Sequence, residues 1–263
     1  MKIINDIDTV KAIINNLSLK KRTGYIRYGD GDLIAMYPES VNQVIGANNK
    51  SFISKDIQQK IIESYNIEDK NYYVGTVEGY KHIRSTYQNI ESQKITNLNL
   101  THHKKLYSAI AFQEVFLEEP DLFIEFCKLI NNKRTLYINN YIEPVLEKFY
   151  GKIEHYISIP KFNATIGYKE TLKTIKDINP SSFDQIILSA GQLTRVIAKD
   201  LWDLFPDKSI LDMGSVSDKI IINESSFGQI AKRSHIKNNM DLIQKRMEYF
   251  NTHLTEITLS DLV

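Results

Sequence analysis

The sequence predicts an α/β protein with a mostly parallel sheet and helices on both of its faces. Short apolar runs typical of buried strands alternate with longer amphipathic segments of helical spacing, most clearly in the second half. The chain has 263 residues, and its Gly and Pro are spread too thinly to mark a linker. We therefore expect one domain over 1–263, with an N-terminal helix in 1–20 and a C-terminal helical tail in 237–263.

The middle of the chain is predicted to be helix-rich, after a first part in which helices and short strands are mixed. Val10, Ile13, Ile14 and Leu17 recur at helical spacing, and Asp6 or Asp8 is the expected N-cap. Further helices are expected at 56–65, 104–116 and 121–130, and short strands at 24–28 and 71–75.

The second half is predicted to alternate strands and helices regularly. Strands are expected at 135–138, 154–159, 185–189 and 209–213. Helices are expected at 143–150, 167–177, directly after Gly191, and at 237–250.

Composition gives no support to several classes of protein. Lys and Arg number 33 against 32 Asp and Glu, without a basic block, so bulk charge gives no support to nucleic-acid binding. The one cysteine, Cys127, cannot form an internal disulfide, which fits a reducing compartment. Acidic residues begin too early for a signal peptide, and no apolar run approaches the ~18–20 residues of a membrane span. We expect a cytoplasmic protein with no transmembrane segment.

Polar clusters follow four of the predicted strands. They lie at 29–32, 139–140, 190–194 and 212–218. In sheets of this kind ligands bind beyond the carboxyl ends of the strands. The clusters are therefore the expected binding site.

The first cluster is the acidic stretch Arg27-Tyr28-Gly29-Asp30-Gly31-Asp32. Glycine at position 31 permits backbone conformations closed to other residues, which would let the two carboxylates converge. Paired carboxylates suit Mg²⁺ or Mn²⁺, and a diphosphate would supply further oxygens. The Arg27 guanidinium would donate a bidentate pair of hydrogen bonds to a phosphate. An ordinary Asp-Gly-Asp turn without a metal remains the alternative.

The second cluster, Ser189-Ala190-Gly191-Gln192-Leu193-Thr194-Arg195, is a small-residue turn that opens a helix. The free N–H groups of a helix start bind anions. Either Thr194 or Arg195 would reach a phosphate or ribose. A tight turn with no ligand is the alternative.

Two further clusters are more ambiguous. Asp212 ends a predicted strand and Asp218 lies beyond it, so either would bind a sugar hydroxyl or act as a base. A capping role in a solvated loop is the alternative for both. In 160–165, Asn163 or Lys161 would contact the nucleotide, or Asn163 or Thr165 would simply cap the next helix.

Taken together, these clusters resemble the GT-D family of bacterial glycosyltransferases. That family carries an Arg-aromatic-Gly-Asp-Gly-Glu stretch, a Pro-x-x-Asn-Ala segment, a small-residue loop that opens a helix, and an Asp-x-Gly strand end. The chain matches them in the same order at 27–32, 160–164, 190–198 and 212–215. The resemblance implies a Rossmann-like fold, a nucleotide-sugar donor, commonly UDP-glucose, and a divalent metal held by Asp30 and Asp32.

The chain departs from the family pattern at three places. Asp32 stands where the family usually has Glu, which shortens the carboxylate arm by one methylene. Ser215 stands where many members have His, and the loop at Gly191-Gln192 differs from the usual Gly-Pro-Thr. The shorter carboxylate arm of Asp32 would affect metal binding. The different loop at Gly191-Gln192 would affect the contacts to the phosphates.

We therefore expect a metal-assisted glycosyltransferase that moves a hexose, glucose by resemblance, from a UDP-sugar to a glycan or glycoprotein hydroxyl. The expected catalytic residues are Asp30, Asp32, Asp212 and Asp218, the first two as ligands of Mn²⁺ or Mg²⁺. The expected donor-binding residues are Arg27, Gly29, Gly31, Asn163, Ala190, Gly191, Gln192, Thr194, Arg195 and Ser215.

Three alternatives remain open. Substitutions at Asp32 and Ser215 fit a non-catalytic nucleotide-binding module on the same fold. The segment 210–215 faintly resembles the glycine loop of S-adenosylmethionine-dependent methyltransferases, but it lies late and has one glycine. A metal-dependent phosphoester hydrolase built on Asp30 and Asp32 would want further His or Asp ligands.

Overall fold

The structure is a computed structural model, and it describes residues 2–37, 40–45, 51–76, 103, 105–222 and 238–254. Within them, eight strands form one sheet in the order β1-β6-β5-β2-β10-β9-β7-β8. Every neighbouring pair runs parallel. The strands are β1 (Lys2–Ile3), β2 (Gly24–Tyr28), β5 (Tyr72–Thr76), β6 (Lys105–Ser108), β7 (Arg134–Asn139), β8 (Lys152–Ser158), β9 (Gln185–Leu188) and β10 (Ser209–Asp212).

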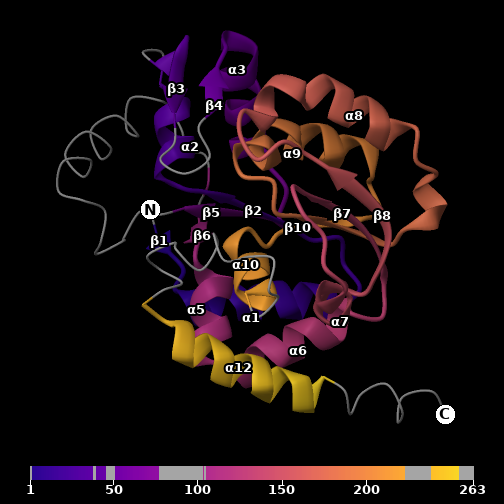
Figure 1. The fold of residues 1–263 in the computed structure, drawn as a ribbon. Helices are drawn as coiled ribbons and strands as arrows, with labels where there is room; N and C mark the ends of the chain where they lie inside the picture. Colours follow the sequence, from indigo (N-terminus) through magenta and orange to yellow (C-terminus); the bar gives the residue numbers. More distant parts are fainter. Residues whose placement is uncertain are drawn as a thin grey trace.

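Helices cover both faces of the sheet (Figure 1). One face carries α2 (Asp30–Ala35), α3 (Lys55–Tyr65), α8 (Tyr168–Lys176) and α9 (Gln192–Leu204). The other carries α1 (Asp6–Ser18), α5 (Ala111–Glu118), α6 (Pro120–Ile130), α7 (Glu147–Tyr150), α10 (Ser215–Ile221) and α12 (Met240–His253). Short 3-10 turns stand at η2 (Pro144–Leu146), η3 (Ala164–Gly167) and η4 (Pro180–Ser182).

Alternation along the strands divides the apolar side chains between two cores. In β2, Ile26 packs with α3 and α9, whereas its neighbour Tyr25 packs with α1 and α5. In β10, Ile210 and Leu211 divide in the same way. Successive strand residues point to opposite faces, so a sheet buried on both sides needs nearly continuous apolar strands.

Two local expectations are wrong. Residues 105–108 form strand β6 rather than the start of a helix, and α5 begins only at Ala111. Pairing with β1 on one side and β5 on the other outweighs the local helical spacing. The cap of α1 is Asn5, whose side chain accepts from the Asp8 N–H, rather than Asp6 or Asp8.

Two further elements lie outside the main sheet pattern. An antiparallel hairpin that the sequence did not predict, β3 (Gln43–Ile45) and β4 (Ser51–Ile53), stands beside α2. The predicted C-terminal helix is α12, which packs its Phe250 ring against Phe116 and Phe123, and 255–263 lie outside the described residues. No helix in the described part of the chain combines the length and apolarity of a membrane span.

The topology creates a crevice between β2 and β10 at the centre of the sheet. After β2 the chain turns to α2 and α3 on one face, and after β10 it turns to α10 on the opposite face. Adjacent strands whose connections diverge in this way leave a binding crevice at their carboxyl ends.

Candidate functional site

A cavity of about 270 Å³ opens at this crevice, over the carboxyl ends of β2, β7, β8, β9 and β10. It brings together residues from all the predicted clusters, although they are spread along the chain. The sequence-predicted residues in its wall are Arg27, Gly31, Asp32, Asn163, Ala190, Gly191, Gln192, Arg195, Ser215 and Asp218.

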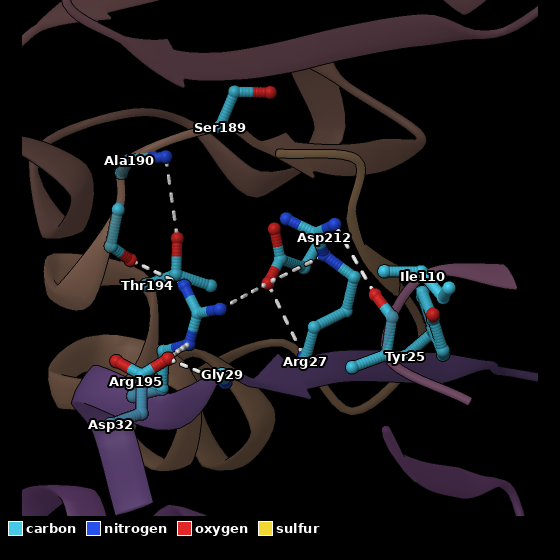
Figure 2. Close-up of polar contacts among 12 residues, drawn as sticks. Tyr25, Arg27, Gly29, Asp32, Ile110, Ser189, Ala190, Thr194, Arg195 and Asp212 are labelled. Carbon is cyan, nitrogen blue, oxygen red and sulfur yellow. Dashed lines mark hydrogen bonds and ion pairs between the residues drawn. The ribbon is translucent and has the colours of Figure 1, made fainter. Parts of the chain in front are cut away.

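Two arginines and two aspartates form a continuous ion-pair chain in and beneath this wall (Figure 2). The Nε of Arg27 lies 3.4 Å from Oδ2 of Asp212, and its backbone N–H donates to the same oxygen at 3.2 Å. That oxygen also lies 3.3 Å from Nη2 of Arg195, whose Nε is 3.1 Å from Oδ2 of Asp32. We call these four residues the arginine–aspartate chain.

The arginine–aspartate chain is almost wholly buried. Side-chain exposures are 12% for Arg27, 7% for Arg195, 8% for Asp32 and 1% for Asp212. Burial by itself lowers the pKa of Arg27, but the Asp212 carboxylate, Tyr25 and Asp32 together outweigh it, and the net shift of the pKa is upward. Removing one partner of such a pair typically costs ~3–5 kcal/mol, because a buried charge is left uncompensated.

The acidic stretch after β2 is the first turn of helix α2 rather than a free turn. Gly29 is the N-cap, and Asp32 at the third helical position accepts from its N–H at 2.9 Å. Gly31 is helical, so the expectation of a special glycine conformation there is wrong. The side chain of Asp30 lies outside the described residues, and its convergence with Asp32 stays a prediction.

Of the two aspartates expected as a base, Asp218 is the one in the cavity wall. It lies on α10, and its Oδ1 accepts from the Tyr141 hydroxyl at 2.6 Å. Asp212, the last residue of β10, lies beneath the cavity and is held by the two arginines. Its place fits an anchor for cations rather than a contact to a sugar.

Two glycines let the chain turn sharply from strand to helix beside the cavity. Gly191 before α9 has φ 57° and Gly214 before α10 has φ 46°, values that favour glycine. At Gly214 space is also decisive, because a Cβ there would lie 1.5 Å from Nη2 of Arg27. The Arg27 guanidinium therefore occupies the space in which a side chain at position 214 would lie.

Two predicted donor-binding residues form hydrogen bonds that fix the starts of helices α9 and α2. The fully buried Thr194 accepts from the Ala190 N–H through Oγ1 at 3.3 Å, which fixes the start of α9. Gly29 contributes the N–H that Asp32 accepts.

The segment 160–165 reaches the cavity through Asn163 and Lys161. Asn163 has φ 54°, in the left-handed region, and its side chain makes no capping hydrogen bond to the turn that follows. The simple N-cap interpretation therefore does not describe it. A non-glycine residue in this conformation costs energy and often marks a functional position.

Sequence reasoning missed Tyr141 and Lys219. The tyrosine directly follows the predicted cluster at 139–140, so its position was the available signal. Lys219 is 2% exposed on α10, a helix that the sequence did not predict. Its Nζ donates to Gln113 Oε1 at 3.3 Å, and burial lowers its pKa to about 8 despite the nearby carboxylate of Glu114.

Two solved structures share this fold. One is the selenomethionine-substituted structure of domain of unknown function 1792 (DUF1792), at 15% identity and a TM-score of 0.60. The other carries the statement that this highly conserved domain "has a distinct glycosyltransferase fold", at 14% identity and a TM-score of 0.61. This chain has a glycosyltransferase-like fold. Each alignment covers 83% of this chain and 79% of the other, which confirms the expected Rossmann-like α/β class.

At these identities the likeness establishes the fold alone. No protein-family model matches the chain, and no curated protein matches it.

Substitution Gly214→Ala is expected to destabilise the protein by at least about 2 kcal/mol, because a methyl group would strain the positive φ and displace Arg27. Urea unfolding measures this loss. The matched control is Gly167→Ala, since a Cβ there meets nothing within 4 Å. Equal stability of the two variants would contradict the account of this turn.

Substitution Lys219→Met is expected to stabilise the protein at pH 7. The folded pKa of about 8 lies below the ordinary lysine value of 10.5, so the native state disfavours the charged amine. This penalty is full below about pH 8 and fades as pH rises toward about 10. The gain in unfolding free energy over wild type should therefore shrink between pH 7 and pH 9.5. An equal gain in unfolding free energy at both pH values, or a loss at pH 7, would contradict the expected penalty for the buried, charged Lys219.

Proposed function

We propose that the protein is a glycosyltransferase that binds a nucleoside-diphosphate sugar in this cavity, with UDP-glucose as donor and a glycan or glycoprotein as acceptor. One observation carries the proposal. Arg27 and Arg195 both stand in the wall of a cavity at the carboxyl edge of a glycosyltransferase-like sheet, each held by a buried carboxylate.

The start of α9 and Arg195 would hold the diphosphate. Helix N-termini present free N–H groups and a favourable dipole to anions. The described partners of Arg195 are Asp32, Asp212 and the Gly191 carbonyl, and each takes a different nitrogen of the guanidinium. One N–H on each terminal nitrogen is thus left for a phosphate oxygen.

Charge balance favours a divalent metal as part of the bound complex. Among the described residues, the wall holds Arg27, Arg195 and Lys161 against Asp32 and Asp218, with Asp212 beneath. Three cationic side chains face three carboxylates, so their charges cancel. The negative charge of a bound diphosphate would therefore not be neutralised by these side chains alone.

The residues fit a metal only together with the substrate. No group of three His, Cys, Asp or Glu side chains converges within the described part of the chain. Mg²⁺ and related ions are often held by one or two carboxylates plus substrate phosphates. Asp30 and Asp32 would supply the carboxylates, and the ion would stabilise charge on the departing nucleoside diphosphate.

Asp218 is the residue we assign as general base. It would take the proton of an acceptor hydroxyl as that oxygen bonds to the anomeric carbon and the bond to the diphosphate breaks. The hydrogen bond from Tyr141 fixes one carboxylate oxygen, which orients the other.

UDP-glucose with Mn²⁺ is expected to raise the melting temperature, because a ligand that binds the native state stabilises it. At a hundred times Kd the gain is about 2.7 kcal/mol, which is on the order of 5 °C for a chain of this size. Differential scanning fluorimetry measures the shift. EDTA should remove most of it, and S-adenosylmethionine should produce none.

Substitution Asp218→Asn separates binding from chemistry. This variant should keep the UDP-glucose shift and lose hydrolysis or transfer of the sugar, measured as UDP release. Absence of a shift with any nucleotide-sugar would overturn the proposal. A shift without UDP release from wild type, across a panel of acceptors, would point to a binding module instead.

A further inference from the structure

Gln192 is held in one orientation by the backbone of α2. Its Nε2 donates to the Gly31 carbonyl at 3.2 Å. A carbonyl oxygen only accepts, so the amide nitrogen must face it and the side chain cannot be flipped end for end. The position of Oε1 is therefore determined as well.

This Oε1 is a buried acceptor with no hydrogen-bond partner among the described residues. Gln192 is 8% exposed and stands in the cavity wall beside Gly31 and Gly191. An unsatisfied buried acceptor is costly, because it has given up its hydrogen bonds to water without gaining another partner. Such a group in a binding cavity indicates a ligand that donates a hydrogen bond.

We infer that Oε1 of Gln192 accepts a hydrogen bond from a sugar hydroxyl next to the diphosphate of the bound donor. The inference rests on the proposed function. Gln192 is the first residue of α9, so its side chain starts where the diphosphate would bind. Both groups bonded to that diphosphate, the ribose and the hexose, carry hydroxyls, whereas the base lies beyond the ribose.

The consequence is selectivity for a hydroxylated donor. A site built to accept from a hydroxyl rejects an analogue that lacks it, because the buried acceptor is then left unpaired. Gln192 would thus be a specificity-determining residue, separate from the ion pairs that hold the phosphates.

The test is calorimetric titration of wild type and Gln192→Met with UDP, UDP-glucose and singly deoxygenated forms of each. The variant should bind UDP-glucose about tenfold more weakly. One deoxy analogue should bind wild type and variant equally, since it lacks the hydroxyl that Gln192 accepts. A loss already seen with UDP assigns the hydroxyl to ribose, and a loss confined to UDP-glucose assigns it to the hexose.

The matched control is Gln58→Met. The Nε2 of Gln58 also donates to backbone carbonyls, those of Ala35 and Tyr37 at and just after the end of α2. Unlike Gln192, Gln58 does not line the cavity. It should leave UDP-glucose affinity unchanged. A merely structural role for Gln192 would weaken every analogue by the same factor.

Three results would overturn the inference. They are unchanged binding of UDP-glucose by Gln192→Met, an equal loss with every analogue, and an equal loss in Gln58→Met. Failure of wild type to bind UDP-glucose would overturn the proposed donor as well, so the two failures are distinguishable.

Discussion

The buried arginine–aspartate chain is the constraint on which the site depends. Asp212 beneath the cavity holds both guanidinium groups, and Asp32 holds Arg195 from the opposite side. Charges this far from water persist only when paired, so each arginine is fixed where its carboxylates place it. Cations held in advance bind an anion without first being reorganised.

The same chain ties together segments that are remote in the sequence. Arg27 belongs to β2, Asp32 to α2, Arg195 to α9 and Asp212 to β10, the four elements that meet at the central crevice. Parallel pairing of β2 with β10 brings Arg27 and Asp212 together. The requirement for glycine at 214 is a further consequence, because the arginine occupies the space of a side chain.

The parts of the fold that were predictable from the sequence are the strands whose continuous apolar runs require burial on both faces of the sheet. Strands β2, β7, β9 and β10 are apolar on both faces, and such runs between amphipathic helices are typical of a parallel sheet. Strand β6 was not predictable, because residues 105–108 become a strand only through pairing with distant β1 and β5.

The site was predictable in its location but not in its internal pairing. Polar clusters at strand ends identified the cavity wall. Sequence spacing cannot show that Asp32 caps a helix and contacts Arg195, or that Asp212 points beneath the cavity while Asp218 lines it. The pairs of Asp32 with Arg195 and of Arg27 with Asp212 join segments more than 150 positions apart, which sequence spacing does not reveal.

Affinity of Asp212→Asn for inorganic pyrophosphate tests the central claim most directly. Simple electrostatics predicts tighter binding, because the substitution removes a negative charge next to the site. The anchoring account predicts weaker binding, by about tenfold or more, because both arginines lose their shared carboxylate. Calorimetry on protein shown to be folded by circular dichroism gives the sign. Affinity equal to or higher than that of wild type would contradict the account.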